Sequence, residues 1–245
     1  MKPFTGIRCL ALIGLLSLNL AMTPPPASLQ GPTARTQGPS SAVPSLADFV
    51  AALKNDQPQQ IVGVYVAKLF ALRVVQQPQN DPTFVSSAPG ATTQFGMAAQ
   101  YGTVGLLAHN YLSGEVFFSL GVGQEVDVIY GDGSLARYSV LALRHFQALR
   151  PLDPASDFID LDDLARAHVS NENLFQDIYA AGSRVVFQTC ILANGDPSWG
   201  RLFVIATPLG AVQPGAEVAA QSPDSTTGPS LSSWASALLR IIHFR

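Results

Sequence analysis

Three side chains in this sequence could together transfer an acyl group: the thiol of Cys190, the imidazole of His109 and the guanidinium of Arg201. A cysteine thiolate attacks carbonyl carbons, and a nearby imidazole can take the thiol proton or pair with the thiolate. Histidine suits this task because its unperturbed pKa lies near neutral pH, so it can later protonate a leaving amine. Arginine stays charged, and its fork of donors can hold a substrate carbonyl or the developing oxyanion.

Each of these residue types also has an ordinary structural explanation. Most free cysteines are small buried apolar residues, and a histidine after an apolar run can be a hydrogen-bonded structural residue. An arginine at the start of a strand often belongs to a surface ion pair. Among the other histidines, His168 lies near a predicted helix end and His243 lies in the tail. His145, just beyond a predicted strand, is the main rival to His109.

The elements that must position these side chains are mostly strands. Short apolar, β-branched runs separated by turn residues predict an all-β domain, a sandwich or a closed barrel. The expected strands are Ile61–Val66, Leu69–Val75, Thr103–Ala108, Glu125–Tyr130, Arg137–Leu143, Val185–Cys190 and Leu202–Thr207. A closed sheet brings strand ends together although the sequence separates His109 from Cys190. Since Ile191–Gly195 looks like the start of a loop, we expect the sulfur at a rim.

Short helices are expected in the connections. They are Leu46–Leu53 capped by Ser45, Asp160–Ala167, and Asn171–Ala181 between the cap Ser170 and Gly182. The whole stretch Leu149–Gly182 is then a long, partly helical connection between two strands. Long connections on a β scaffold commonly contact substrates.

The N-terminus predicts export. Lys2 and Arg8 precede the apolar run Cys9–Met22, which is shorter than the roughly 20 residues of a membrane span. This pattern indicates a signal peptide or an uncleaved anchor, and hence an extracytoplasmic protein, membrane-anchored or secreted at the cell surface. Because Cys9 lies in the leader, the exported part has one thiol and no internal disulfide. Exported proteins usually use cysteines in pairs, so the single Cys190 calls for a structural or functional explanation.

Composition divides the chain into four segments. Residues 1–22 are the leader, 23–57 a Pro/Ser-rich linker with a short helix, 58–210 the globular domain, and 211–245 a low-complexity tail ending in a short amphipathic segment. That last segment, Trp234–Phe244, is too short to span a bilayer but could lie on a membrane surface. The net charge of -3 and the lack of a Lys/Arg cluster argue against nucleic-acid binding.

Three strings carry a resemblance to a known family. Leu107-Ala108-His109-Asn110, then Gln188-Thr189-Cys190, then Gly200-Arg201-Leu202-Phe203-Val204 resemble the three motifs of the sortases, in the same chain order. The stretch Phe117–Val128 looks like the family's strand after its histidine. The resemblance covers about Ile61 to Pro208.

The resemblance implies a closed eight-stranded barrel on the outer face of the membrane. It implies that Cys190 attacks a Thr carbonyl in a Leu-Pro-x-Thr-Gly-like sorting signal of an exported protein, forming a thioacyl enzyme. An amine from a cell-wall precursor or a protein lysine then resolves it. His109 acts as general acid and base, Arg201 stabilises the oxyanion, Thr189 and Ala108 contact substrate, and neither a metal nor a cofactor is needed.

Two other functions remain open from the sequence. The first is a sortase-like cysteine hydrolase, which gives the thioacyl group to water instead of an amine. The second is a secreted β-barrel binding module in which Cys190 is structural. The module predicts a buried, inert thiol, because reactivity follows thiolate character and access.

Overall fold

The computed structural model describes residues 43–153, 155–163, 165 and 167–209. Of the two units into which the chain divides, Met1–Ser40 and Ser41–Arg245, these residues belong to the second. The predicted leader at 1–22, most of the linker and the tail at 211–245 lie outside the described residues. Within the described residues, no helix is long and apolar enough to cross a membrane.

Strands dominate the described residues, as the sequence predicts. In chain order the elements are α1 (Leu46–Leu53), β1 (Ile61–Val66), β2 (Phe70–Gln76), β3 (Ala91–Gln94), α2 (Gly96–Ala99), β4 (Val104–Leu107), the 3-10 helix η1 (Ser113–Ser119), β5 (Glu125–Tyr130), β6 (Leu135–Ala148), β7 (Phe158–Asp160), β8 (His168–Val169), α3 (Asn171–Tyr179), β9 (Val185–Ala193) and β10 (Asp196–Pro208).

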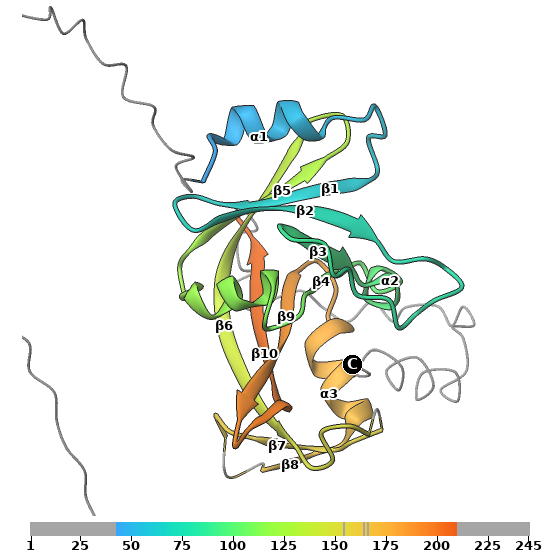
Figure 1. Cartoon of the computed structure of the whole chain (residues 1–245), viewed down its shortest axis with the longest axis vertical. Helices are drawn as coiled ribbons and strands as arrows, with labels where there is room; N and C mark the ends of the chain where they lie inside the picture. The colour runs from blue at the N-terminus through green and yellow to red at the C-terminus, as the bar shows by residue number, and fades with distance from the viewer. Residues whose placement is uncertain (1–42, 154, 164, 166, 210–245) are drawn as a thin grey trace, which may run out of the picture. The chain divides into compact units, whose positions relative to one another are not determined.

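Eight of these strands close into a barrel, which confirms the expected fold class (Figure 1). Hydrogen-bonded neighbours follow the order β10, β9, β4, β3, β2, β1, β5, β6, and β6 pairs again with β10. The pairs β2–β3 and β4–β9 are parallel, and the others in the ring are antiparallel. Strands β7 and β8 extend the sheet from β6.

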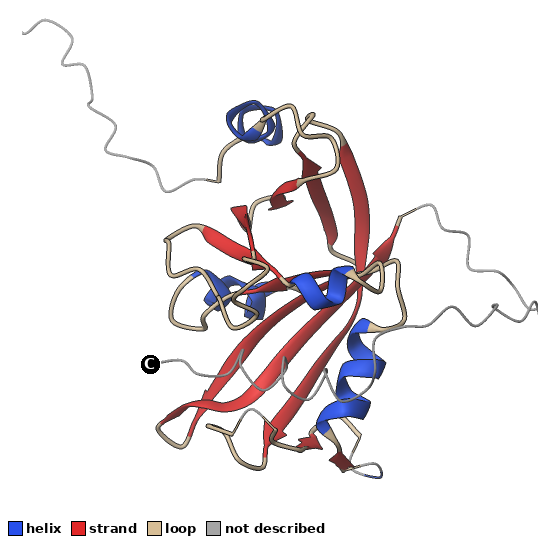
Figure 2. Cartoon of the chain, turned by 90° about the vertical axis from the view of Figure 1, so that its right-hand side faces the viewer, coloured by secondary structure: helices blue, strands red, loops and turns tan. Residues whose placement is uncertain are grey.

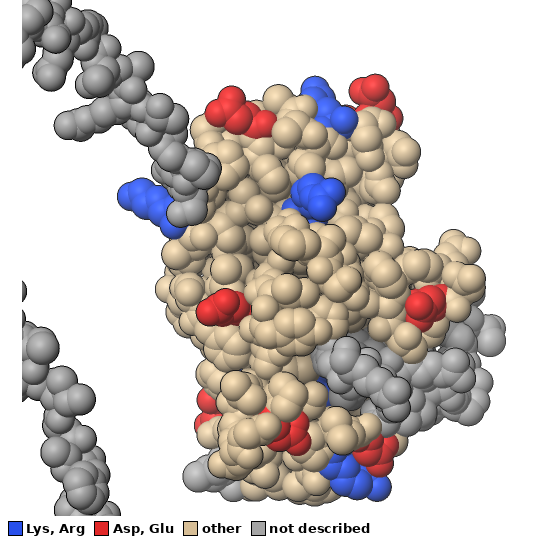
Figure 3. All heavy atoms as spheres, in the orientation of Figure 1, with Lys and Arg blue, Asp and Glu red and all other residues tan. Residues whose placement is uncertain are grey.

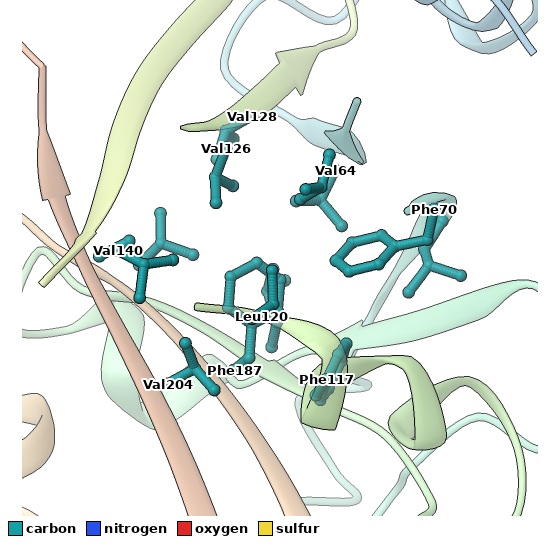
Figure 4. Close-up of a cluster of buried hydrophobic side chains, with 14 of the residues drawn as sticks. Val64, Phe70, Phe117, Leu120, Val126, Val128, Val140, Phe187 and Val204 are labelled. Atoms are coloured by element: carbon teal, nitrogen blue, oxygen red, sulfur yellow. The ribbon is translucent and has the colours of Figure 1, made fainter. Parts of the chain in front are cut away.

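The inside of the barrel is filled by apolar side chains (Figure 4). Because side chains alternate along a strand, each strand sends every second residue inward, for example Val126 and Val128 from β5, and Phe187 from β9. Phe117 of η1 reaches the same core, with its ring centroid 5.0 Å from that of Phe187. This core keeps the strands that carry the candidate site in fixed register.

A second apolar cluster covers the outer face of β4, β9, β10 and β6. Helix α3 lies beside these strands (Figure 2) and packs Leu174, Phe175, Ile178 and Tyr179 against them. Ser170 caps the helix as predicted, since its hydroxyl accepts a hydrogen bond from the Asn173 amide at 3.2 Å. Charged side chains on the molecular face in Figure 3 are scattered among neutral ones.

Two predicted elements are wrong in part. The stretch Phe117–Val128 is not one strand: it starts in η1, and β5 begins only at Glu125. A tight turn after His109 directs the chain into η1, because the amides of Leu112 and Gly114 both donate to the His109 carbonyl. Asp160, expected to open a helix, instead ends β7, which is hydrogen-bonded to β6.

Candidate active site

Three neighbouring strands hold the predicted site residues side by side. On antiparallel β9 and β10, Cys190 and Arg201 are direct cross-strand partners. Strand β4 runs parallel to β9, and the Ala108 amide, just beyond β4, donates to the Gln188 carbonyl at 3.2 Å. The register of β4 and β9 pairs Leu107 with Gln188, and its continuation by two residues places His109 level with Cys190.

Alternation along the strands puts Cys190 and Arg201 on the same face. Leu107, two residues before His109, belongs to the outer cluster. Val186, four residues before Cys190, and Phe203, two residues after Arg201, belong to it as well. Since side chains two or four positions apart on a strand share a face, the sulfur and the guanidinium lie on the outer face of the barrel wall. His109 lies just beyond β4, and its imidazole contacts the carbonyl of Val85, which packs against the same outer cluster.

All three side chains are buried, which overturns two expectations. Cys190 is 3% exposed, His109 9% and Arg201 1%. Cys190 is not at a rim, because β9 continues beyond it to Ala193. The pairing of β9 with β10 also extends to Ala193, further than the apolar run in the sequence predicts. Nor is Arg201 a surface ion-pair partner.

The groups around Cys190 shift the pKa of its thiol in opposite directions. Burial is the largest effect and raises the pKa of the thiol, because a buried thiolate loses its hydration. The Arg201 guanidinium and a hydrogen bond from the side chain of Ser198 lower this pKa, whereas the nearby Asp196 carboxylate raises it. The balance favours the protonated thiol, so the sulfur needs a base to become a nucleophile.

His109 is the histidine that the strand register places level with Cys190. Burial lowers the pKa of its imidazole, and its hydrogen bond to the Val85 carbonyl partly offsets that effect. The Nε2 atom lies 3.4 Å from that carbonyl oxygen. Its ring also lies against Tyr111, with the centroids 5.1 Å apart. A lowered pKa keeps the imidazole neutral at neutral pH, and the neutral form is the one that can accept a proton.

Arg201 is a buried cation bound only to backbone oxygens among the described residues. Its Nη1 donates to the Ser198 carbonyl at 2.8 Å and to the Gly200 carbonyl at 2.7 Å. Its Nη2 is buried and has no hydrogen-bond partner among those residues. A buried donor without a partner is rare in native structures and calls for an explanation. A substrate oxygen beside Cys190 would satisfy it.

Thr189 and Ala108, predicted to contact substrate, face the other way. Ala108 belongs to the barrel core, and Thr189 pairs across the sheet with the core residue Leu202. The Thr189 hydroxyl donates to the Ala108 carbonyl at 2.9 Å. This hydrogen bond holds the end of β4 against β9. It therefore helps to fix the position of His109 along the direction of the strands, relative to Cys190.

Gly114 packs tightly against this junction, and we expect its replacement by alanine to disturb it. An added Cβ would lie 2.3 Å from the Thr189 hydroxyl and 2.7 Å from the His109 carbonyl oxygen. Because part of the obstacle is backbone, the Gly114→Ala variant should lose about 1–3 kcal/mol of unfolding free energy in a denaturant titration. Gly121→Ala is the control, since nothing lies within 4 Å of its added Cβ. Equal stability of the two variants would contradict the tight junction.

The rival histidines lie away from the thiol. His145 of β6 is the cross-strand partner of the core residue Leu202, so it is on the face opposite to Arg201. Its Nδ1 lies 3.1 Å from a carboxylate oxygen of Asp162. His168 pairs with Asp157 at 3.3 Å, and His243 lies outside the described residues. Among the described histidines, His109 alone has the register to reach Cys190.

Sequence reasoning missed Ser198 and Asp196, which shift the pKa of the Cys190 thiol in opposite directions. Asp196 also lines an open hollow of about 470 Å³ together with the loop residues Arg150, Pro151, Leu152 and Asp153. The signal for both residues was weak, because Asp196-Pro197-Ser198 looks like an ordinary turn. In the structure these residues instead open β10, where Asp196 pairs with Ala193 of β9.

Comparisons with known proteins give matches only among solved structures. No protein-family model and no curated protein match this sequence. Streptococcus agalactiae sortase C1 in complex with MTSET is 13% identical, covering 68% of this chain and 84% of that one, with a TM-score of 0.39. Listeria monocytogenes sortase A is 10% identical over 61% and 87%, with a TM-score of 0.36. Clostridium perfringens sortase D5 is 15% identical over 68% and 90%, with a TM-score of 0.37. All three of these structures are sortases.

Proposed function

We propose that this chain is a sortase-type cysteine transpeptidase with Cys190 as nucleophile, His109 as general acid and base, and Arg201 as oxyanion stabiliser. One observation carries the proposal: three neighbouring strands bring these side chains together at the outer face of the barrel wall, with Arg201 directly opposite Cys190. The substrates would be an exported protein with a C-terminal sorting signal and an amine acceptor, from a cell-wall precursor or a protein lysine. The reaction would take place outside the cytoplasm, at a membrane surface.

The first half of the reaction follows from the protonation states. The pKa directions favour a neutral thiol and a neutral imidazole at rest. His109 takes the thiol proton as the sulfur attacks the scissile carbonyl carbon, and Arg201 Nη2 receives the resulting oxyanion. The C–N bond then breaks, and the imidazolium donates its proton to the leaving amine. The product is a thioester on Cys190.

The second half reverses these proton transfers. An acceptor amine attacks the thioester carbonyl, and His109 takes the amine proton. The oxyanion collapses, the C–S bond breaks, and the thiolate is reprotonated. The amide joins the acyl group to the acceptor. Because Cys190 is only 3% exposed, the surrounding side chains must move to let the substrate reach the sulfur.

The direct test is to incubate the purified full chain with a sorting peptide and an excess of a primary amine. The expected product, identified by mass spectrometry, is the N-terminal peptide fragment joined to the amine. Cleavage without any amide product would reject transfer and support the cysteine hydrolase. Absence of both products across a panel of sorting peptides would count against both enzymes.

The binding module deserves a separate test, because the burial of Cys190 and the raised thiol pKa are what that alternative expects. Alkylation kinetics on the folded full chain, with Cys9 replaced by serine, separate the two. If His109 is the base, His109→Ala should slow alkylation of Cys190 about a hundredfold. His145→Ala, which removes an imidazole paired with Asp162, should change nothing. Equal rates in wild type and His109→Ala would favour the module.

A further inference from the structure

The imidazole of His109 contacts a segment that the mechanism above does not use, the connection between β2 and β3. Its Nε2 atom lies 3.4 Å from the backbone carbonyl oxygen of Val85 in that connection. A carbonyl oxygen can only accept a hydrogen bond, so Nε2 must carry the proton in this contact. In the neutral ring the basic lone pair then lies on Nδ1. The Val85 carbonyl therefore selects one of the two tautomers of the proposed base.

A side-chain hydroxyl orients this carbonyl. The Val85 carbonyl and the Ser86 amide belong to one planar trans peptide unit, so they point in opposite directions. The Ser86 amide donates a hydrogen bond to the side-chain oxygen of Thr93 at 2.8 Å. A group that holds the amide on one side of this peptide also aims the carbonyl on the other side. Thr93 thus sets the direction in which the carbonyl faces the imidazole.

The position of Thr93 in the sheet makes this bond a firm one. Thr93 lies on β3 and is 0% exposed, and Ser86 is 8% exposed, so their hydrogen bond is shielded from solvent. The cross-strand partner of Thr93 is Leu107 of β4, two residues before His109. The imidazole and the hydroxyl that orients its partner are therefore carried by neighbouring strands of the barrel wall, whose pairing fixes their separation.

Gln77 holds the same connection from the other side. Its side-chain amide donates to the carbonyls of Pro82 and Phe84 at 3.0 and 3.1 Å, and its side-chain oxygen accepts from the Gly96 amide at 3.0 Å. Phe84 directly precedes Val85, whose own side chain packs against the outer apolar cluster. The carbonyl that faces the imidazole is thus held on both sides, as the support of a preorganised catalytic group should be.

We propose that Thr93 is a positioning residue for the base. Its hydroxyl holds the peptide between Val85 and Ser86, and the Val85 carbonyl then keeps the proton of neutral His109 on Nε2. The Nδ1 atom is left to accept the thiol proton. The inference rests on the proposed role of His109. The same hydrogen bond also favours proton acceptance, because it raises the pKa of an imidazole whose pKa burial lowers.

Other titratable and charged groups near the imidazole come from its own segment, from β9 and β10, and from the β2–β3 connection. The ring of Tyr111 lies against the imidazole, with the centroids 5.1 Å apart, and Cys190 and Arg201 lie on the next two strands. Asp81 of the connection is hydrogen-bonded within its own turn. Replacing Thr93 leaves the charges of these groups unchanged, so an altered titration of His109 reports on the Val85 contact.

The test observes the His109 ring by nuclear magnetic resonance in the full chain, without any substrate. Imidazole nitrogen shifts identify the protonated nitrogen, and the His109→Gln spectrum assigns the signal. In the wild type the proton should lie on Nε2 and exchange slowly with solvent. Thr93→Val keeps the branched shape but removes the hydroxyl. It should lower the pKa of His109 by about 0.4–1 pH unit and speed exchange of the Nε2 proton about two- to tenfold.

Three further variants separate this role from a general loss of packing. Thr93→Ser keeps the hydroxyl and should retain the wild-type pKa and exchange rate. Gln77→Ala loosens the connection without altering Thr93, and should change both quantities in the same direction as Thr93→Val. Thr103→Val removes another buried hydroxyl, bonded to the Tyr179 carbonyl at 2.7 Å, and should leave His109 unchanged.

Three results would overturn the inference. They are a wild-type proton on Nδ1, an unchanged His109 in Thr93→Val or Gln77→Ala, and an equal change in Thr103→Val. If Thr93→Val does not fold, Gln77→Ala decides the question, because Gln77 is only half-buried. Since no peptide is used, a failure of transpeptidation would not produce any of these results.

Discussion

The Cys190→Ala variant is expected to lose acyl transfer completely while it keeps its fold. Alanine retains the Cβ and removes only the sulfur, so no thioester can form. The sulfur is buried, and its removal leaves a cavity of about one atom, which should lower the unfolding free energy by roughly 1–1.5 kcal/mol. For a chain of this size, that corresponds to a few degrees in melting temperature.

Mass spectrometry of the peptide and amine reaction, together with a thermal melt, measures both effects on one sample. Cys9→Ala is the matched control, because it removes the only other cysteine of the chain and should leave transfer unchanged. Transfer that survives in Cys190→Ala would remove the nucleophile from its proposed role. A collapse of the melting temperature would instead indicate that the side chain serves the core.

Much of the barrel could be predicted because its strands have a strong local signal. The run Glu125–Tyr130 alternates, and the turn after it contains Gly133, whose φ is +88°, a conformation that favours glycine. The same holds for α3, where a serine cap and three apolar positions on one face defined the helix. Short strands were missed where the local signal is weak: β3, β7 and β8 have at most four residues and depend on their partners.

The sequence motifs identified the residues of the candidate site, but they did not predict that these residues are buried. The three motifs identify residue types and their order, and register then brings them together at the outer face of the barrel wall. Whether a strand end is exposed depends on elements far away in the sequence that cover it. Here β9 runs on past Cys190, and an outer apolar cluster covers the same face. The residues next to Cys190 in the sequence do not show that these distant elements bury its side chain.

Arg201→Met is expected to reduce acyl transfer about a hundred- to a thousandfold, the usual loss when an oxyanion donor is removed. Methionine fills a similar volume without charge. The variant should nevertheless keep its unfolding free energy to within about 1 kcal/mol, because two effects oppose each other. Two backbone carbonyls lose their donor, but the protein no longer buries a guanidinium without a carboxylate partner. Kinetics and chemical denaturation of the same preparation measure the two effects.

Arg144→Met provides the matched comparison. Arg144 lies on β6, the strand next to β10, and unlike Arg201 it has a carboxylate partner. Its guanidinium pairs at 2.5 Å with Asp160, whose side chain is 4% exposed, and lies 5.3 Å from the ring centre of Phe146. Its removal leaves a buried carboxylate without its partner, so we expect a loss of about 2–3 kcal/mol, reduced by the partial exposure of Arg144. The protein that remains folded should keep its transfer rate. If instead Arg201→Met is the variant that unfolds and Arg144→Met the one that loses transfer, the buried guanidinium beside Cys190 is a structural cation and the oxyanion must be held elsewhere.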